Sequence, residues 1–123
     1  MEKEFIPYEQ ALALKELGFD ELCFMHYENN VLFQPFGNKD FYKNSELEND
    51  EVSAPLYQQT FRWFREKHNL ESHVKKDWTD GVYHGYESMI ECVDGIIDCG
   101  TYKTYEEAEL ECLKKLIEIV KNK

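Results

Sequence analysis

The end of the chain constrains the fold most strongly. From Ala108 to Val120, apolar residues recur three and four positions apart, which is the spacing of a helix that buries one face. The preceding residues 104–107, Thr-Tyr-Glu-Glu, have the pattern of a capping box that opens such a helix. Glu109 falls within the apolar arc, where a carboxylate must find a partner, shift its pKa or reach water at the rim of the buried face, and we expect the rim position.

Three runs of β-favouring residues precede this helix, at 72–76, 83–93 and 96–102. Asp94-Gly95 separates the last two runs, and this dipeptide is a strong signal for a type I′ hairpin turn. The sequence therefore predicts consecutive antiparallel strands that the last helix covers.

A second helix is predicted upstream of the strands. Ser53 has the chemistry of an N-cap, Pro55 suits the first turn, and the helical pattern ends near His68. Trp63 and Phe64 fall on its apolar arc, so we expect both side chains in the core.

The first part of the chain predicts a helix and a hairpin. The helix begins near Pro7 and runs through Leu17, and Gly18 supplies a left-handed end. Two short β-rich runs, 23–27 and 31–33, flank Glu-Asn-Asn and favour a hairpin.

Together these elements predict an α+β fold with the order α-β-β-α-β-β-β-α, in which helices pack on one face of an antiparallel sheet. Residues 1–123 fit a single domain. Within it, 1–33 and 53–123 are expected sub-lobes, joined by the polar, acidic loop 34–52.

The composition narrows the classes of function. Of the residues, 42% are hydrophobic, which suffices for one core, and the formal net charge of −11 argues against binding nucleic acid or anionic membranes. No apolar run approaches the roughly 20 residues that span a bilayer. The four cysteines form no CxxC pair, which favours a reducing, cytoplasmic location.

Four segments carry a resemblance to a known group of proteins. They read Ala-Leu-Ala-Leu-Lys-Glu-Leu-Gly-Phe at 11–19, Ala-Pro-Leu-Tyr-Gln-Gln at 54–59, Phe-Arg-Trp-Phe-Arg-Glu-Lys at 61–67 and Thr-Tyr-Glu-Glu-Ala-Glu at 104–109. The chain resembles a family of small uncharacterised proteins from phages and related elements of Bacteroidetes-type bacteria. That resemblance implies a small accessory protein of a phage or its host and brings no activity with it.

The second half also resembles a double-stranded-RNA-binding domain in its order, α-β-β-β-α. Such domains hold phosphates with lysines at the start of the last helix, where this chain has Glu106, Glu107, Glu109 and Glu111. Carboxylates repel a duplex backbone, so we expect the topology without the RNA-binding function.

The basic residues gather in one stretch, 62–76. Arg62 and Arg65 are three positions apart and share the polar side of the second helix, and Lys75 and Lys76 follow on the next strand. These four residues are the candidate site for a phosphate or carboxylate, which guanidinium groups hold in a fork. The alternative is that they pair with carboxylates of this chain.

Strand alternation predicts that Glu87, Glu91 and Asp98 lie on one face of the last hairpin and form an acidic surface. With the Asp94-Gly95 turn, Glu91 lies directly across from Asp98, and facing like charges are costly unless a cation intervenes. The face is either simply solvated or the site of a small enzyme that uses Glu91, Asp98 or His84.

The cysteines and histidines predict no metal site and no cofactor. Strand parity places Cys92 and Cys99 on the face of Ile90 and Ile97, where they fill space beneath a helix without a disulfide. The histidines lack metal-binding spacing such as HExxH, and no catalytic motif occurs.

We therefore expect a binding protein rather than an enzyme. Its partner would be a host protein or a small anionic ligand, consistent with an accessory protein of a phage or mobile element. An alternative is an acidic mimic of nucleic acid that inhibits a host nucleic-acid-binding protein, which requires carboxylates to gather on one face.

Overall fold

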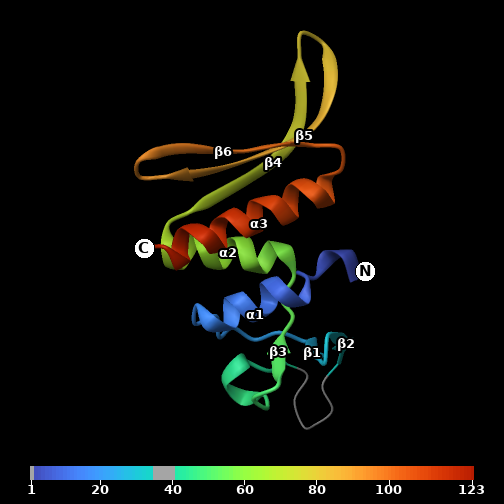
Figure 1. The fold of residues 1–123 in the computed structure, drawn as a ribbon, viewed down its shortest axis with the longest axis vertical. Coiled ribbons are helices and arrows are strands. Elements are labelled where there is room, and N and C mark those ends of the chain that lie inside the picture. The colour runs from blue at the N-terminus through green and yellow to red at the C-terminus, as the bar shows by residue number, and fades with distance from the viewer. Residues whose placement is uncertain (1, 35–40) are drawn as a thin grey trace. The chain divides into compact units, whose positions relative to one another are not determined.

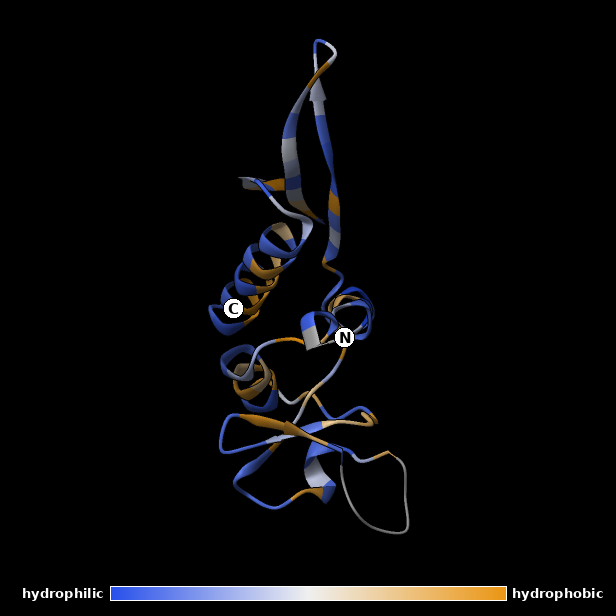
Figure 2. Cartoon of the chain, turned by 90° about the vertical axis from the view of Figure 1, so that its right-hand side faces the viewer, coloured by the Kyte–Doolittle hydropathy of each residue, from blue (hydrophilic) through white to orange (hydrophobic). Residues whose placement is uncertain are grey.

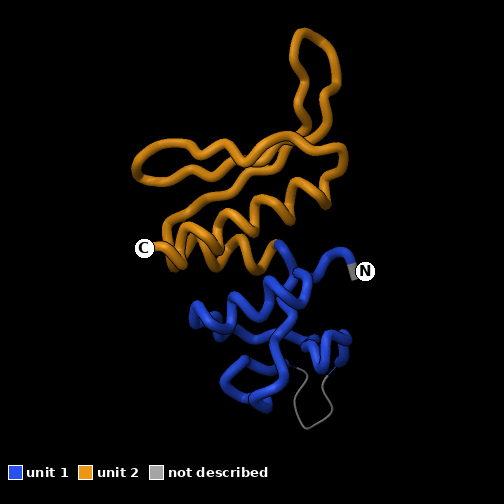
Figure 3. Tube along the Cα trace, in the orientation of Figure 1, with its two compact units in different colours: residues 1–57 blue, residues 58–123 orange. Residues whose placement is uncertain are grey.

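The chain forms two compact units, residues 1–57 and 58–123 (Figure 3). The computed structural model describes residues 2–34 and 41–123. Each unit contains one three-stranded antiparallel sheet, and residues 2–34 and 41–123 form three α-helices, so the predicted α+β class is confirmed. None of the described helices is long and apolar enough to cross a membrane.

Unit 1 begins with a short 3-10 helix, Glu2–Glu4, and the helix α1, Tyr8–Glu16. The predicted end of α1 is confirmed: Gly18 has a φ of 95°, and the Phe19 N–H donates to the Leu14 carbonyl across 2.9 Å.

The sheet of unit 1 has the order β2-β1-β3, with β1 at His26–Glu28, β2 at Val31–Phe33 and β3 at Glu51–Ser53. Asn29 and Asn30 both have positive φ, 50° and 68°, as a type I′ turn requires, so the predicted hairpin is confirmed. The strand β3 and the 3-10 helix η2, Asn44–Glu46, lie in the segment expected to be a loop, of which residues 35–40 are outside the described ranges.

The predicted N-cap role of Ser53 is wrong. Ser53 lies in β3 opposite His26, and its N–H donates to Oδ1 of Asn44 across 2.8 Å. The helix α2 begins later, at Tyr57, and ends at His68. A tertiary hydrogen bond from the buried Asn44 side chain therefore holds Ser53 in a strand, which no local pattern around Ser53 indicates.

The sheet of unit 2 is a meander of β4, Glu71–Thr79, β5, Val82–Cys92, and β6, Gly95–Tyr102. The helix α3, Tyr105–Lys121, contacts all three strands (Figure 1). Its residues separate into a polar and an apolar side (Figure 2), and the buried positions are Ala108, Glu109, Cys112, Leu113, Leu116 and Ile117. Thr104 is its N-cap as predicted, with Oγ1 accepting the Glu107 N–H across 3.1 Å.

The strands β4 and β5 extend beyond β6 as a two-stranded arm, visible at the top of Figure 1. Pairing of β5 with β6 stops at Tyr86, whereas β4 and β5 pair as far as Thr79 and Val82. Asp80 and Gly81 form the turn with positive φ values of 55° and 77°, another type I′ geometry.

The predicted turn between β5 and β6 is wrong by one residue. Cys92 pairs with Gly95, so Val93-Asp94 forms the turn, and Gly95 opens β6 with a φ of 128°. A type I′ turn at Asp94-Gly95 would need positive φ at Asp94, whereas here only the glycine adopts it, after the turn.

The new register separates the two carboxylates that were expected to face each other. Glu91 lies opposite Ile96, and Asp98 lies opposite Met89 in the same register; the pairing becomes irregular only beyond this point, between Ser88 and Met89. Side-chain parity is unchanged, because the pairing moved by an even number of positions. Ile90 therefore still shares its face with Ile97, now directly opposite it.

The predicted burial of α2 is confirmed. Trp63 and Phe64 are 4% and 0% exposed, whereas Arg62 and Arg65 are exposed. The expected rim position of Glu109 is wrong, because only 7% of this residue is exposed. Burial, with a smaller contribution from the charge of Glu106, raises the pKa of Glu109 to about 7.

Candidate functional site

Unit 2 contains a pocket of about 530 Å³ between α2, β4 and the start of α3. Four of its lining side chains are basic: Arg62, Arg65, His73 and Lys75. Tyr105 of α3 also lines the pocket. The pocket thus brings together three of the four residues predicted for an anion site.

Local geometry explains which residues take part. Arg62 and Arg65 are one helical turn apart and exposed, so their side chains lie on the same side of α2. His73 and Lys75 are two apart on β4 and project from one face of the strand. Lys76, the fourth predicted residue, is exposed and does not line this pocket, as strand alternation requires.

Carboxylates of β5 lie beside the basic side chains of β4. Lys75 lies directly opposite Glu87, and its Nζ is 3.4 Å from Glu87 Oε1. The His73 Nε2 is 2.9 Å from Glu91 Oε1. Two of the three residues expected to form an acidic face therefore alternate with basic residues of the neighbouring strand.

Arg65 differs from these paired cations. Its guanidinium is exposed and makes no ion pair with any residue in the described ranges. An unpaired guanidinium beside a pocket keeps all of its donors for a ligand. Tyr105 complements it as a donor, because burial above all, and then Glu109, raises the pKa of its hydroxyl and keeps the proton on it.

The residues considered for an enzyme are spread apart. His84 and Glu91 lie on the same strand seven residues apart, which corresponds to about 23 Å. The Asp98 carboxylate is engaged locally, where Oδ1 accepts the Gly100 N–H across 2.8 Å. His84 and Glu91 are therefore too far apart to act together on one reacting group.

All four cysteines are free, as predicted. A side-chain hydrogen bond links the thiols of Cys99 and Cys112 of α3. This bond lowers the pKa of Cys99, and together with burial it raises the pKa of Cys112. The expected place of Cys99 beneath a helix is therefore confirmed.

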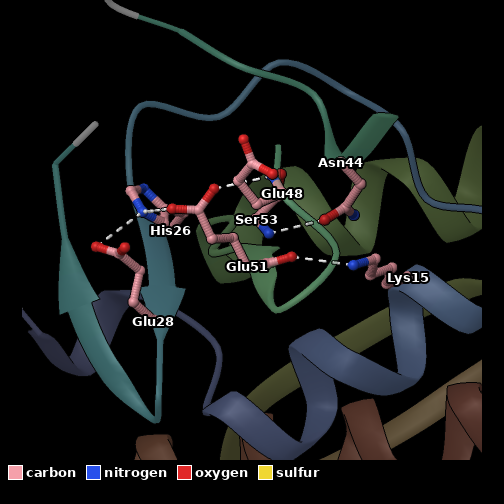
Figure 4. A network of polar contacts seen from close by, with 7 residues as sticks. All are labelled: Lys15, His26, Glu28, Asn44, Glu48, Glu51 and Ser53. Atoms are coloured by element: carbon pink, nitrogen blue, oxygen red, sulfur yellow. Dashed lines mark hydrogen bonds and ion pairs between the residues drawn. The ribbon is translucent and has the colours of Figure 1, made fainter. Parts of the chain in front are cut away.

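A second group of side chains, in unit 1, was not predicted. His26 and Glu28 alternate along β1, and Glu51 of β3 lies directly opposite Glu28 (Figure 4). The His26 Nε2 is 3.1 Å from Glu51 Oε2 and 3.4 Å from Glu28 Oε2. The one available signal was the alternation of His26 and Glu28, because β3 lies in a segment without strand periodicity.

The basic pocket of unit 2 and the His26 group of unit 1 differ in what they can bind. The basic pocket offers hydrogen-bond donors and positive charge, whereas the His26 group offers one nitrogen and two carboxylates. The chain matches no protein-family model, no curated protein and no solved structure.

Proposed function

We propose that this chain is a binding protein that holds an anionic group in the pocket of unit 2. The observation that supports the proposal is the convergence of Arg62, Arg65, His73 and Lys75 on one pocket in a chain whose net charge is −11. The negative charge elsewhere on the protein repels anions, so a pocket lined by basic side chains attracts an anionic ligand to that one place.

The ligand class follows from the donors. Arg62 and Arg65 lie one helical turn apart, and a guanidinium group has a planar fork of N–H donors that matches the oxygens of phosphate or of a carboxylate. The Tyr105 hydroxyl adds a neutral donor from a third element. Phosphate offers more acceptor oxygens than a carboxylate, so we propose a phosphate-bearing ligand.

The carboxylates of β5 set the strength of binding. Glu87 competes with the ligand for Lys75, and Glu91 competes for His73, at the distances given above. A ligand has to replace part of this internal neutralisation. Binding should therefore weaken as salt is added, because the groups involved are largely exposed.

Arg65→Ala is the sharpest test of the proposal. A charge-assisted hydrogen bond contributes about 1.5–3 kcal/mol, so we expect the substitution to weaken binding of pyrophosphate at least tenfold in isothermal titration. The melting temperature should change little, because Arg65 has no ion pair in the described ranges to lose. Citrate titrated in parallel distinguishes a phosphate site from a carboxylate site.

Two matched variants complete this test. Lys76→Ala removes a neighbouring exposed cation that does not line the pocket, and it should change affinity less than twofold. Glu87→Gln removes the competitor of Lys75 and should strengthen binding. Equal losses in Arg65→Ala and Lys76→Ala would show that only the overall charge matters, and the pocket would then not be the site.

The same observations favour this function over mimicry of nucleic acid. Mimicry requires a face that carries carboxylates alone. On the β4–β5 pair, Glu87 and Glu91 stand beside Lys75 and His73, which gives a mixed face.

A second candidate function, recognition of a host protein, is supported by the arm of β4 and β5. Trp78, Val82 and Tyr83 are 60%, 54% and 45% exposed there. Exposed aromatic residues are the usual anchors of protein interfaces, and the resemblance to phage accessory proteins is compatible with a host partner. Loss of one defined host protein from a pull-down with Trp78→Ser, but not with Val93→Ser, would support this candidate.

A further inference from the structure

His26 is the most unusual polar side chain of unit 1. It is 4% exposed, and neither of its ring nitrogens has a hydrogen-bond partner among the described residues. Burying imidazole nitrogens without partners costs free energy, and a bound ion or water is one way in which such groups are satisfied. The Nε2 atom is aimed between Glu28 and Glu51 (Figure 4).

The two carboxylates flank Nε2 and do not accept a hydrogen bond from it. Both oxygens lie close enough, at 3.1 and 3.4 Å, but neither contact has the direction of a hydrogen bond. The oxygens thus stand to the sides of the axis on which Nε2 would bind a proton or a metal.

These separations are the ones expected between ligands of a common metal ion. With metal–ligand bonds of about 2.0–2.2 Å, neighbouring donor atoms are about 2.9 Å apart in octahedral and about 3.4 Å apart in tetrahedral coordination. The donor atoms of His26, Glu28 and Glu51 all lie within 4.8 Å of one another. One ion on the Nε2 axis could reach all three.

A cation would also resolve a repulsion in the sheet. Glu28 and Glu51 are directly opposite each other in the β1–β3 pair. Like charges in this position destabilise a sheet unless a positive charge lies between them.

Neighbouring groups hold Glu51 in the required orientation. Its Oε1 accepts the Glu48 N–H across 2.9 Å, which leaves Oε2 directed at His26 (Figure 4). The Lys15 Nζ of α1 donates to the main-chain oxygen of Glu51 across 3.0 Å and fixes β3 at this point. Such outer contacts orient ligands in metal sites.

Space remains for further ligands. A pocket of about 280 Å³ opens beside the three residues and is also lined by Glu46 and Glu48. Water can occupy the remaining coordination positions from this side, and the extra carboxylates make the surroundings more negative.

From these observations we propose that His26, Glu28 and Glu51 bind a divalent first-row transition metal, with Zn²⁺ as the probe. The imidazole nitrogen favours such ions over Ca²⁺ and Mg²⁺, which prefer oxygen ligands alone. The site is independent of the anion pocket, because all of its residues belong to unit 1.

The test is a titration of the full chain with Zn²⁺ after treatment with a chelator and its removal. We expect one ion per chain by isothermal titration and a rise in melting temperature of several degrees, because an ion that binds the folded state stabilises it. Glu28→Gln should weaken the affinity at least tenfold and abolish the rise. Glu48→Gln removes a carboxylate of the same pocket that is not one of the three ligands, so it should weaken the affinity less than twofold and keep the rise in melting temperature.

The variants also separate this proposal from a protonated His26 that simply bridges two carboxylates. At a metal site, Glu28→Gln without metal is at least as stable as the unaltered chain, because one of two facing charges is gone. At a protonated bridge, the same substitution lowers the melting temperature, and Zn²⁺ causes no stoichiometric shift.

Three results would overturn the proposal: no response to Zn²⁺, an equal response in Glu28→Gln and Glu48→Gln, or a response to Ca²⁺ or Mg²⁺ alone. Substitution with Co²⁺ adds a spectroscopic check. An intense near-ultraviolet band would show thiolate ligands and assign the metal to the cysteines, whereas weak visible bands alone support nitrogen and oxygen ligands.

Discussion

Replacing Trp63 by alanine should lower the free energy of unfolding by about 3–5 kcal/mol. The side chain is 4% exposed, and its ring packs edge-on against Phe64 and His68, with centroid distances of 5.0 Å to each. The substitution leaves a cavity that the packed side chains around it can fill only in part. Because small domains are stable by only about 5–15 kcal/mol, a large fraction of the protein would unfold at moderate urea concentrations.

The chain supplies its own control, since its only other tryptophan is on the arm. Trp78 is 60% exposed, and Trp78→Ala should cost less than about 1 kcal/mol. Urea unfolding followed by circular dichroism measures both variants. Equal losses would mean that Trp63 is not part of the core that holds α2.

Glu109 should make the protein less stable as the pH rises. The pKa of its carboxyl group is about 7 in the folded chain against an ordinary 4.5, because burial disfavours the charge. Below pH 4.5 the group is protonated in both states and costs nothing. Between pH 4.5 and 7 the unfolded chain ionises first, so the free energy of unfolding falls, by an amount on the order of 3 kcal/mol in all.

Glu109→Gln should remove this pH dependence. We expect the variant to be more stable than the unaltered chain at pH 8 and nearly equal to it at pH 4, by thermal unfolding at a series of pH values. Glu106→Gln should retain the dependence with a lower midpoint, because Glu106 contributes to the raised pKa of Glu109. A variant Glu109→Gln that loses stability at pH 8 would show that the carboxylate is needed as an ion.

Local chemistry predicted the ends of the helices well. Gly18 ends α1 and Thr104 caps α3 because each acts on the backbone within a few residues. Ser53 has the same capping chemistry, yet a side chain nine positions away determines its structure. Patterns in sequence report local preferences, and tertiary hydrogen bonds override them where a buried amide such as Asn44 is available.

The β5–β6 turn shows a different limit. An Asp-Gly pair predicts a hairpin but leaves the register open, since the glycine can occupy the turn or the position after it. Asp80-Gly81 forms the turn between β4 and β5, and it was not predicted, because the β-rich run 72–76 ends before the end of β4 at Thr79. The face on which each side chain of β5 and β6 lies was predictable, because a shift of two positions in the pairing leaves strand alternation unchanged.

The candidate sites also differ in how far local sequence patterns could predict them. Strand parity separates Lys75 from Lys76, and helical spacing joins Arg62 to Arg65, so most of the basic pocket follows from the sequence. The roles of Glu87 and Glu91 required the register of β4 with β5. The His26 group could not be predicted, because its third member, Glu51, belongs to a strand of three residues that only pairing with β1 reveals.

The connectivity of the two sheets has a consequence for how the chain folds. In unit 2 each strand pairs with its neighbour in sequence, so the contacts close short loops and can form quickly. In unit 1, β1 pairs with β3, which comes much later in the chain, so this pairing cannot form until β3 is present. A bridge between Phe5 and Leu56 likewise joins the two ends of the unit. A nascent chain would therefore hold unit 1 open until Leu56 has left the ribosome, and refolding of unit 1 should be the slower phase.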